Sequence, residues 1–144
     1  MLTRILNTLK KDNGTFFPPV DERSLCFISS LLSSHHFPPV PVDYIALLKQ
    51  TDGLSWNGVE LYGTRANDRE MLGYTLPGLI EANLDFAQVV PMRGKLLLGR
   101  AAEELFVYDS MDQKYHIINR MDFSDNCGFP TFSEALYLFV DELF

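Results

Sequence analysis

The sequence predicts an α+β domain in which helices come first, a central, mostly antiparallel sheet follows, and one helix closes the chain. Helical spacing of apolar residues dominates the first third, whereas the clearest strand character lies between residues 95 and 120. The last residues return to helical spacing. At 144 residues, the chain has the length of one typical domain, so we expect a single domain over residues 1–144.

Three helices are predicted in the first third of the chain. The first has apolar residues three and four positions apart and ends at Asn13-Gly14. Its apolar face consists of Leu2, Ile5, Leu6 and Leu9. Asp21 is expected to cap the second helix, and Pro41 is expected to begin a third helix that ends at Gly53. Extended proline-rich segments separate the helices, because proline disfavours helical geometry at the residue before it.

Beyond Gly53 the pattern becomes extended. Strands are predicted at residues 59–63, 95–100, 104–110 and 114–120, a polar loop at 64–75 that leads to a weak strand, and a short helix at 77–86. Alternation in the strand 104–110 places Glu104, Phe106 and Tyr108 on a face that is expected to meet solvent.

The last helix is predicted to follow a loop over residues 122–130. Thr131 and Glu134 fit a capping box at its start. Its expected buried face consists of Ala135, Leu136, Phe139, Val140 and Leu143. This helix would cover the sheet and complete the fold.

No sequence motif of a metal, cofactor or catalytic site is present. His35 and His36 are adjacent, so their side chains diverge and cannot share an ion, and the chain has no HExxH or CxxC motif. The glycines are single and dispersed, which is typical of turns rather than of a phosphate-binding loop. We therefore expect no metal and no cofactor, and a protein that is not an enzyme.

Two cysteines are too few for a disulfide framework. Cys26 has apolar neighbours and is interpreted as a small core side chain. Cys127 is expected to fill a gap in a loop. Cys127 and His116 could still meet in space as a nucleophile and its base, which leaves an enzyme as one further hypothesis.

The net charge of −7 is concentrated in the second part of the chain. Residues 1–51 carry five Lys and Arg against four Asp and Glu, whereas residues 52–144 carry seven against fifteen. An acidic surface disfavours nucleic acids and anionic membranes and complements a basic protein partner, with solubility as the alternative role of the charge. No apolar run reaches the roughly 18 residues of a membrane span, and the N-terminus lacks the apolar region of a signal peptide. We expect a cytoplasmic protein.

The order of sequence motifs resembles the SUKH superfamily, most closely its YrhA-like branch. The motifs that carry the resemblance are, in order, "DYIALLKQTDG", "GVELYGT", "LIEAN", "LLLGR", "ELFVYD", "YHIINR" and "FPTFSEALYLFVDELF". The resemblance covers roughly residues 17–144. Where the family pattern usually has Asn-Gly after the first of these helices, this chain has Asp52-Gly53, and Asp can fulfil the same turn geometry.

The resemblance implies an α+β fold and a protein that acts by binding. Bacterial members of the superfamily are widely associated with immunity against polymorphic toxins, and fungal relatives act as regulators and scaffolds of cell-wall synthesis. Many such toxins are nucleases with a basic substrate groove, which the acidic residues 52–144 would complement. We therefore expect a bacterial immunity protein that binds a cognate toxin, with a non-catalytic regulatory scaffold of the same fold as the alternative.

Acidic and aromatic side chains of the second part of the chain are the expected partner-binding residues. They are Asp52, Trp56, Glu60, Glu103, Glu104, Asp109 and Asp112. For Trp56 the competing interpretation is a partly buried core residue. For the carboxylates it is a solvated surface.

Overall fold

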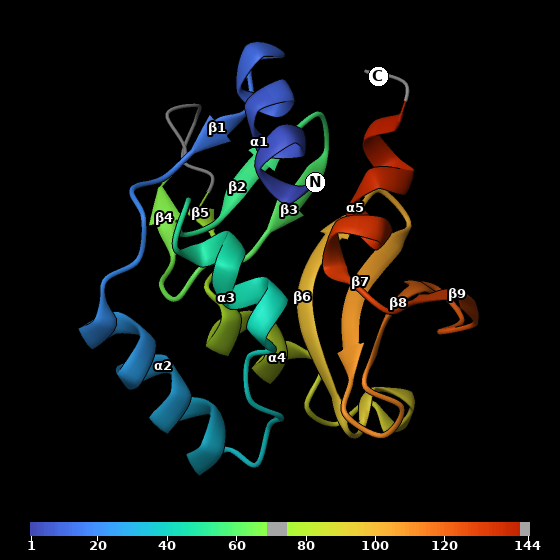
Figure 1. Ribbon diagram of the computed structural model, residues 1–144. Coiled ribbons are helices and arrows are strands. Elements are labelled where there is room, and N and C mark those ends of the chain that lie inside the picture. The colour runs from blue at the N-terminus through green and yellow to red at the C-terminus, as the bar shows by residue number, and fades with distance from the viewer. Residues whose placement is uncertain (69–74, 142–144) are drawn as a thin grey trace.

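The computed structural model describes residues 1–68 and 75–141 and confirms the α+β fold with an antiparallel sheet (Figure 1). The strands of the sheet are β1 (Thr15–Phe16), β2 (Leu54–Trp56), β3 (Val59–Leu61), β6 (Lys95–Ala101), β7 (Glu104–Asp109), β8 (Lys114–Asn119) and β9 (Asp125–Phe129). They are arranged in the order β1-β2-β3-β6-β7-β8-β9, and every neighbouring pair is antiparallel. Apart from this sheet, a short strand β4 (Asn67–Asp68) pairs with β5 (Thr75–Leu76).

The helices are α1 (Leu2–Lys11), α2 (Glu22–Ser34), α3 (Val42–Leu48), α4 (Leu79–Asp85) and α5 (Phe132–Val140), with a short 3-10 helix η1 (Val90–Met92). Two of the helices, α2 and α5, begin at a residue whose side chain caps the helix. The Asp21 carboxylate accepts a hydrogen bond from the Ser24 N–H at 2.7 Å and so caps α2. The Thr131 hydroxyl accepts from the Glu134 N–H at 3.3 Å at the start of α5. Asp21 and Thr131 are thus confirmed as the residues that cap α2 and α5.

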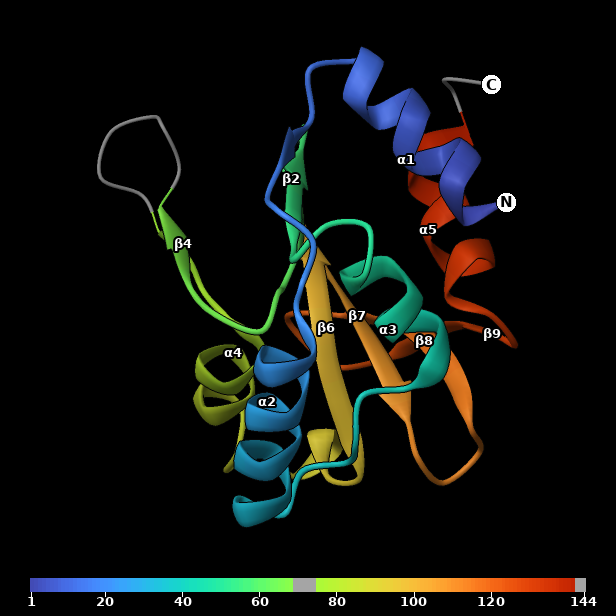
Figure 2. The same cartoon turned by 60° about the vertical axis from the view of Figure 1, so that its left-hand side comes forward.

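The helices α4 and α5 lie on opposite faces of the sheet. Phe106 of β7 packs against Phe132 and Phe139 of α5, with ring centroids 6.2 and 4.7 Å apart. The neighbouring Leu105 points to the other face, where it lines a cavity together with Ala82 of α4. Helices α1 and α3 lie beside α5, and α2 lies beside α4 (Figure 2). The solvent-facing side predicted for β7 is therefore wrong at Phe106, which α5 covers and leaves 2% exposed.

Tyr44 of α3 joins this helix to the sheet. Its hydroxyl lies 2.5 Å from the Tyr62 carbonyl oxygen and 2.9 Å from that of Leu98. Its ring makes an edge contact with Phe132 at 5.1 Å. Burial raises the pKa of Tyr44 well above its ordinary value, so the phenol remains a neutral hydrogen-bond donor.

The segment between α3 and β2 forms a tight helix-to-sheet corner around Asp52. The carboxylate accepts two hydrogen bonds from Thr64, one from the backbone N–H at 2.7 Å and one from the hydroxyl at 2.8 Å. Gly53 has a φ of +96°, which favours glycine. Gly63 allows the two segments to approach, since a Cβ atom there would lie 2.2 Å from the Asp52 carbonyl oxygen. The corner is thus held by backbone proximity and by a buried carboxylate.

The structure differs from the predicted elements in several respects. Strands β1 and β2 were not predicted, and β4 lies within the predicted polar loop over residues 64–75, of which residues 69–74 lie outside the described part of the chain. Helix α3 ends at Leu48 rather than near Gly53, because the Thr51 hydroxyl exchanges hydrogen bonds with the backbone of Phe17 and directs the chain away from helical geometry. The predicted loop over residues 122–130 contains strand β9, which pairs with β8. Cys26 is exposed rather than buried, because it lies about 200° around α2 from the buried Ile28. Of the predicted buried face of the last helix, Leu143 lies outside the described residues.

Candidate functional site

The residues predicted to bind a partner fall in four separate places. Asp52 lies in the helix-to-sheet corner, and Glu60 lies in a cavity beside α4. A third place is a hollow lined by Trp56, Glu103 and Glu104. The fourth is the opposite end of β7, where Asp109 and Asp112 lie. Asp52, Trp56 and Glu60 are only 3–5% exposed. The seven residues therefore do not form one surface, and three of them have structural roles inside the domain.

Glu60 of β3 is paired within the domain. Its carboxylate oxygen Oε1 lies 3.1 Å from Nε of Arg100. The two residues are direct cross-strand partners in β3 and β6, so the register of the sheet creates this ion pair. Both line a cavity of about 260 Å³ together with Tyr62 and Arg120. Arg100 balances the charge of Glu60, and little of the carboxylate is presented to a protein partner.

Trp56, Glu103 and Glu104 line a hollow that we call the acidic hollow. Its other lining residues include Val59, Ala102 and Phe139. The turn between β2 and β3 and the turn between β6 and β7 meet here, because β3 and β6 are neighbours in the sheet, and α5 contributes Phe139. The volume is about 380 Å³. Glu103 is exposed and Glu104 is partly exposed, so the hollow combines an apolar floor with a carboxylate rim.

Trp56 belongs mainly to the edge of the core. Its indole N–H donates a hydrogen bond to the Asp12 carboxylate at 2.9 Å. This bond ties the end of α1 to β2, and Trp56 is 5% exposed. Only an edge of the indole therefore reaches the acidic hollow. The competing interpretation of Trp56 as core accounts for its position best.

Asp109 and Asp112 lie beside His116, a residue that no motif marks as functional. The Nε2 atom of His116 is 2.7 Å from Oδ2 of Asp112, and its Nδ1 atom is 2.8 Å from Oδ2 of Asp125. The first contact is a hydrogen bond, whereas the second has the distance of an ion pair without hydrogen-bond alignment. Burial lowers the pKa of His116, but the two carboxylates outweigh burial and raise the pKa above its ordinary value.

No sequence motif predicts this cluster of aspartates around His116. Asp112 precedes His116 by four residues across a turn, and Asp125 comes from the next strand, where the register of β8 and β9 shifts. Gly128, not Cys127, stands opposite His116 in the sheet. Both imidazole nitrogens of His116 face aspartate carboxylates, so in this structure His116 is paired with Asp112 and Asp125 and not with Cys127.

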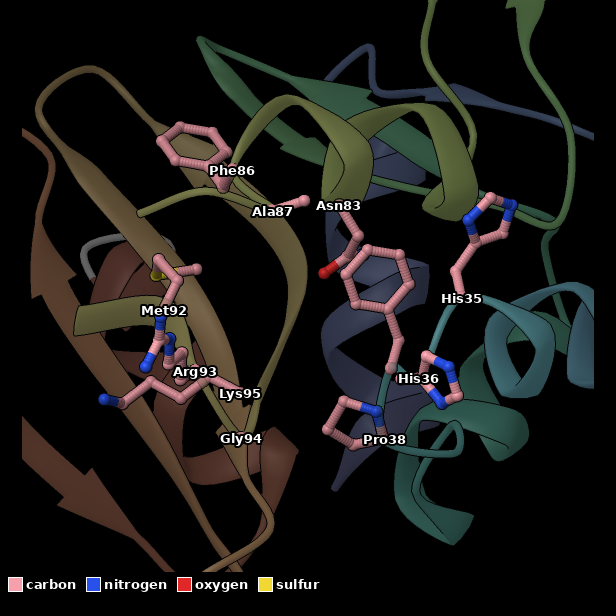
Figure 3. A pocket seen from close by; sticks show the side chains of 11 residues that line it. His35, His36, Pro38, Asn83, Phe86, Ala87, Met92, Arg93, Gly94 and Lys95 are labelled. Atoms are coloured by element: carbon pink, nitrogen blue, oxygen red, sulfur yellow. The ribbon is translucent and has the colours of Figure 1, made fainter. Parts of the chain in front are cut away.

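A further cavity is lined by several cationic or titratable side chains that do not converge (Figure 3). His35 and His36 stand on one side, and Arg93 and Lys95 on the other, with their charged ends directed away from the histidines. The Lys95 ammonium donates to a backbone carbonyl in η1 at 2.6 Å. Asn83 lies between the two sides, and its amide is bonded to the backbone of α4 and of β6. These side chains therefore do not make a common anion site.

Comparisons with known proteins leave the resemblance to the SUKH superfamily as an expectation. The chain matches no protein-family model, and no curated protein matches its sequence. Over residues 1–68 and 75–141, no helix combines the length and the apolar character needed to cross a membrane.

Proposed function

We propose that this protein is a cytoplasmic immunity protein that binds a basic toxin domain, expected to be a nuclease, and neutralises it. The observation that carries the proposal is the acidic hollow, in which an apolar floor meets the carboxylates of Glu103 and Glu104. The excess of acidic residues in positions 52–144 supports a basic partner. The resemblance to the SUKH superfamily supports a toxin as that partner.

Lys and Arg are the side chains that suit the acidic hollow. Each has an aliphatic stem that packs on apolar surface and a cationic end that remains near polar groups. Ala102 and Phe139 offer the apolar surface, and Glu103 and Glu104 offer the anionic rim. An Arg side chain would benefit most, because its planar guanidinium can bond a carboxylate with two N–H groups.

The charge of the whole domain would also accelerate the encounter. Complementary charge raises association rates, and the effect falls as salt screens it. We therefore expect the association rate with the toxin domain to fall with ionic strength. The dissociation rate would depend more on the buried centre of the interface.

Co-expression tests the proposal directly. The toxin candidate is the C-terminal domain of the protein encoded immediately upstream, and its toxicity should disappear when this protein is present. Glu103→Lys should lower the association rate on the order of tenfold at low salt. Glu81→Lys changes the net charge equally at an exposed residue of α4 and serves as the matched control.

Three results would contradict the proposal. Persistent toxicity in the presence of the protein excludes neutralisation of that domain, and a metabolic operon at the locus would favour the regulatory scaffold instead. Equal effects of Glu103→Lys and Glu81→Lys would show that the overall charge, rather than the acidic hollow, determines binding.

A further inference from the structure

We propose that Asp109, Asp112 and His116 form a binding site for a divalent transition metal ion, Zn²⁺ in particular, with Asp125 supporting the imidazole from behind. One ligand atom from each of the first three residues lies within 4.8 Å of the other two. The site is at the opposite end of β7 from Glu104 and does not depend on the proposed immunity function. It revises the expectation of no metal drawn from sequence motifs.

The buried imidazole is the feature that distinguishes this cluster from a group of surface carboxylates. The side chain of His116 is nine-tenths buried, and its Nε2 atom is directed at the Asp112 carboxylate. A histidine that binds a metal usually has its second nitrogen on a carboxylate, which orients the ring. Oδ2 of Asp125 lies 2.8 Å from Nδ1 without hydrogen-bond alignment, close enough to form that bond once the ring turns into line with it. Gly128 leaves room for the ring, since a Cβ atom there would lie 3.0 Å from Cε1 of His116.

The two carboxylate ligands are oriented by the turn that carries them. Asp109 accepts a hydrogen bond from the Met111 N–H through Oδ1, and Asp112 accepts one from the Lys114 N–H through its own Oδ1. The second oxygen of Asp112 faces Nε2 of His116 at 2.7 Å, so a cation would insert between these two atoms, with the second oxygen of Asp109 as its further ligand. With the imidazole, the two carboxylates make a set of one nitrogen and two oxygen ligands, which Zn²⁺ accepts in tetrahedral sites completed by water.

Binding requires only a small movement of the turn. Zn²⁺ lies about 2.0–2.2 Å from nitrogen and oxygen ligands, so two tetrahedral ligands are separated by roughly 3.3 Å. The Nε2 atom of His116 and Oδ2 of Asp112 are 2.7 Å apart. Asp112 is on an exposed turn, with 43% of its side chain accessible, so it can move outward while the buried ring stays in place.

Electrostatics also favours a cation here. Three aspartates surround one imidazole. Besides His116, Lys114 is the basic residue whose charge interacts with that of Asp112. A divalent cation compensates more of this negative charge than the single proton of an imidazolium does.

Calorimetric titration of metal-free, untagged protein tests the site. We expect ZnCl₂ to bind saturably at one ion per chain and to raise the midpoint of thermal unfolding, whereas MgCl₂ at the same concentration should do neither, because Mg²⁺ prefers oxygen ligands alone. Asp112→Asn retains the shape of the turn and should weaken Zn²⁺ binding at least tenfold. Asp125→Asn should weaken it by roughly 10–100-fold through the orientation of the ring.

The control is the double variant His35→Gln/His36→Gln, which removes two exposed histidines outside the cluster. It should bind Zn²⁺ as the wild type does, and circular dichroism should show all variants folded. The proposal is overturned if wild-type protein binds no Zn²⁺ saturably, if Asp112→Asn binds it equally well, or if the double variant loses it. Equal binding of Mg²⁺ would also overturn it, because the cluster would then act only as a region of negative charge.

Discussion

The Asp52 carboxylate holds the helix-to-sheet corner through two hydrogen bonds to Thr64, and Asp52→Ala removes both. A hydrogen bond to a charged group contributes about 1.5–3 kcal/mol. Desolvation of a carboxylate that is 3% exposed offsets part of this gain. We therefore expect Asp52→Ala to lower the free energy of unfolding by about 3 kcal/mol. In a domain of this size, that loss lowers the midpoint of thermal unfolding by roughly 10 °C.

Asp52→Asn separates the loss of hydrogen bonds from the loss of charge. The amide oxygen can still accept from the Thr64 N–H, and the Thr64 hydroxyl can turn to accept from the amide NH₂. We expect a cost of about 1 kcal/mol, measured by urea unfolding followed by circular dichroism. Asp85→Ala at an exposed position is the control and should stay within about 0.5 kcal/mol of wild type. If Asp52→Ala costs no more than Asp85→Ala, the carboxylate does not hold the corner.

Three further predictions concern single groups. Tyr44→Phe removes the O–H that lies beside the backbone carbonyls of Tyr62 and Leu98, and the Leu98 carbonyl also accepts from a backbone N–H. The free energy of unfolding, measured with urea, should fall by about 1–2 kcal/mol. An unchanged free energy of unfolding would contradict the hydrogen bond. The Ser24 backbone N–H lowers the pKa of Asp21, so the cap stabilises α2 above the ordinary pKa and is lost as the pH falls through the lowered one. Between about pH 5 and pH 2, wild type should lose more stability than Asp21→Asn, and parallel curves would refute this. Exposed Cys26 should react with a maleimide in the folded protein. If Cys26→Ser reacts equally fast, the reactive thiol is not that of Cys26.

Helix starts that are fixed by a contact between residues close in the sequence were predictable. The cap of α2 is formed by Asp21 and Ser24, three residues apart, and the cap of α5 by Thr131 and Glu134. The end of α3 was not predictable in the same way, because Phe17 holds Thr51 from a segment 34 residues earlier. Helix boundaries thus follow the sequence where the determining contact is local.

Short strands and the candidate sites required information about register. Strand β2 has only three residues and β9 has polar ones, so neither shows the alternation that marks a strand. Trp56 is fixed by Asp12, 44 residues away. The surroundings of His116 depend on a register shift between β8 and β9 that no motif records. The pairing of Glu60 with Arg100 likewise becomes visible only once β3 and β6 are neighbours.

The bond between Trp56 and Asp12 gives the protein an optical reporter. Trp56 is the single tryptophan of the chain, so its fluorescence reports one place only. Its indole N–H is held by the residue that directly follows α1. Release of α1 would expose the ring to water and shift its emission to longer wavelength, even while the central strands remain paired. Tryptophan emission compared with far-ultraviolet circular dichroism can therefore distinguish detachment of the first helix from unfolding of the sheet.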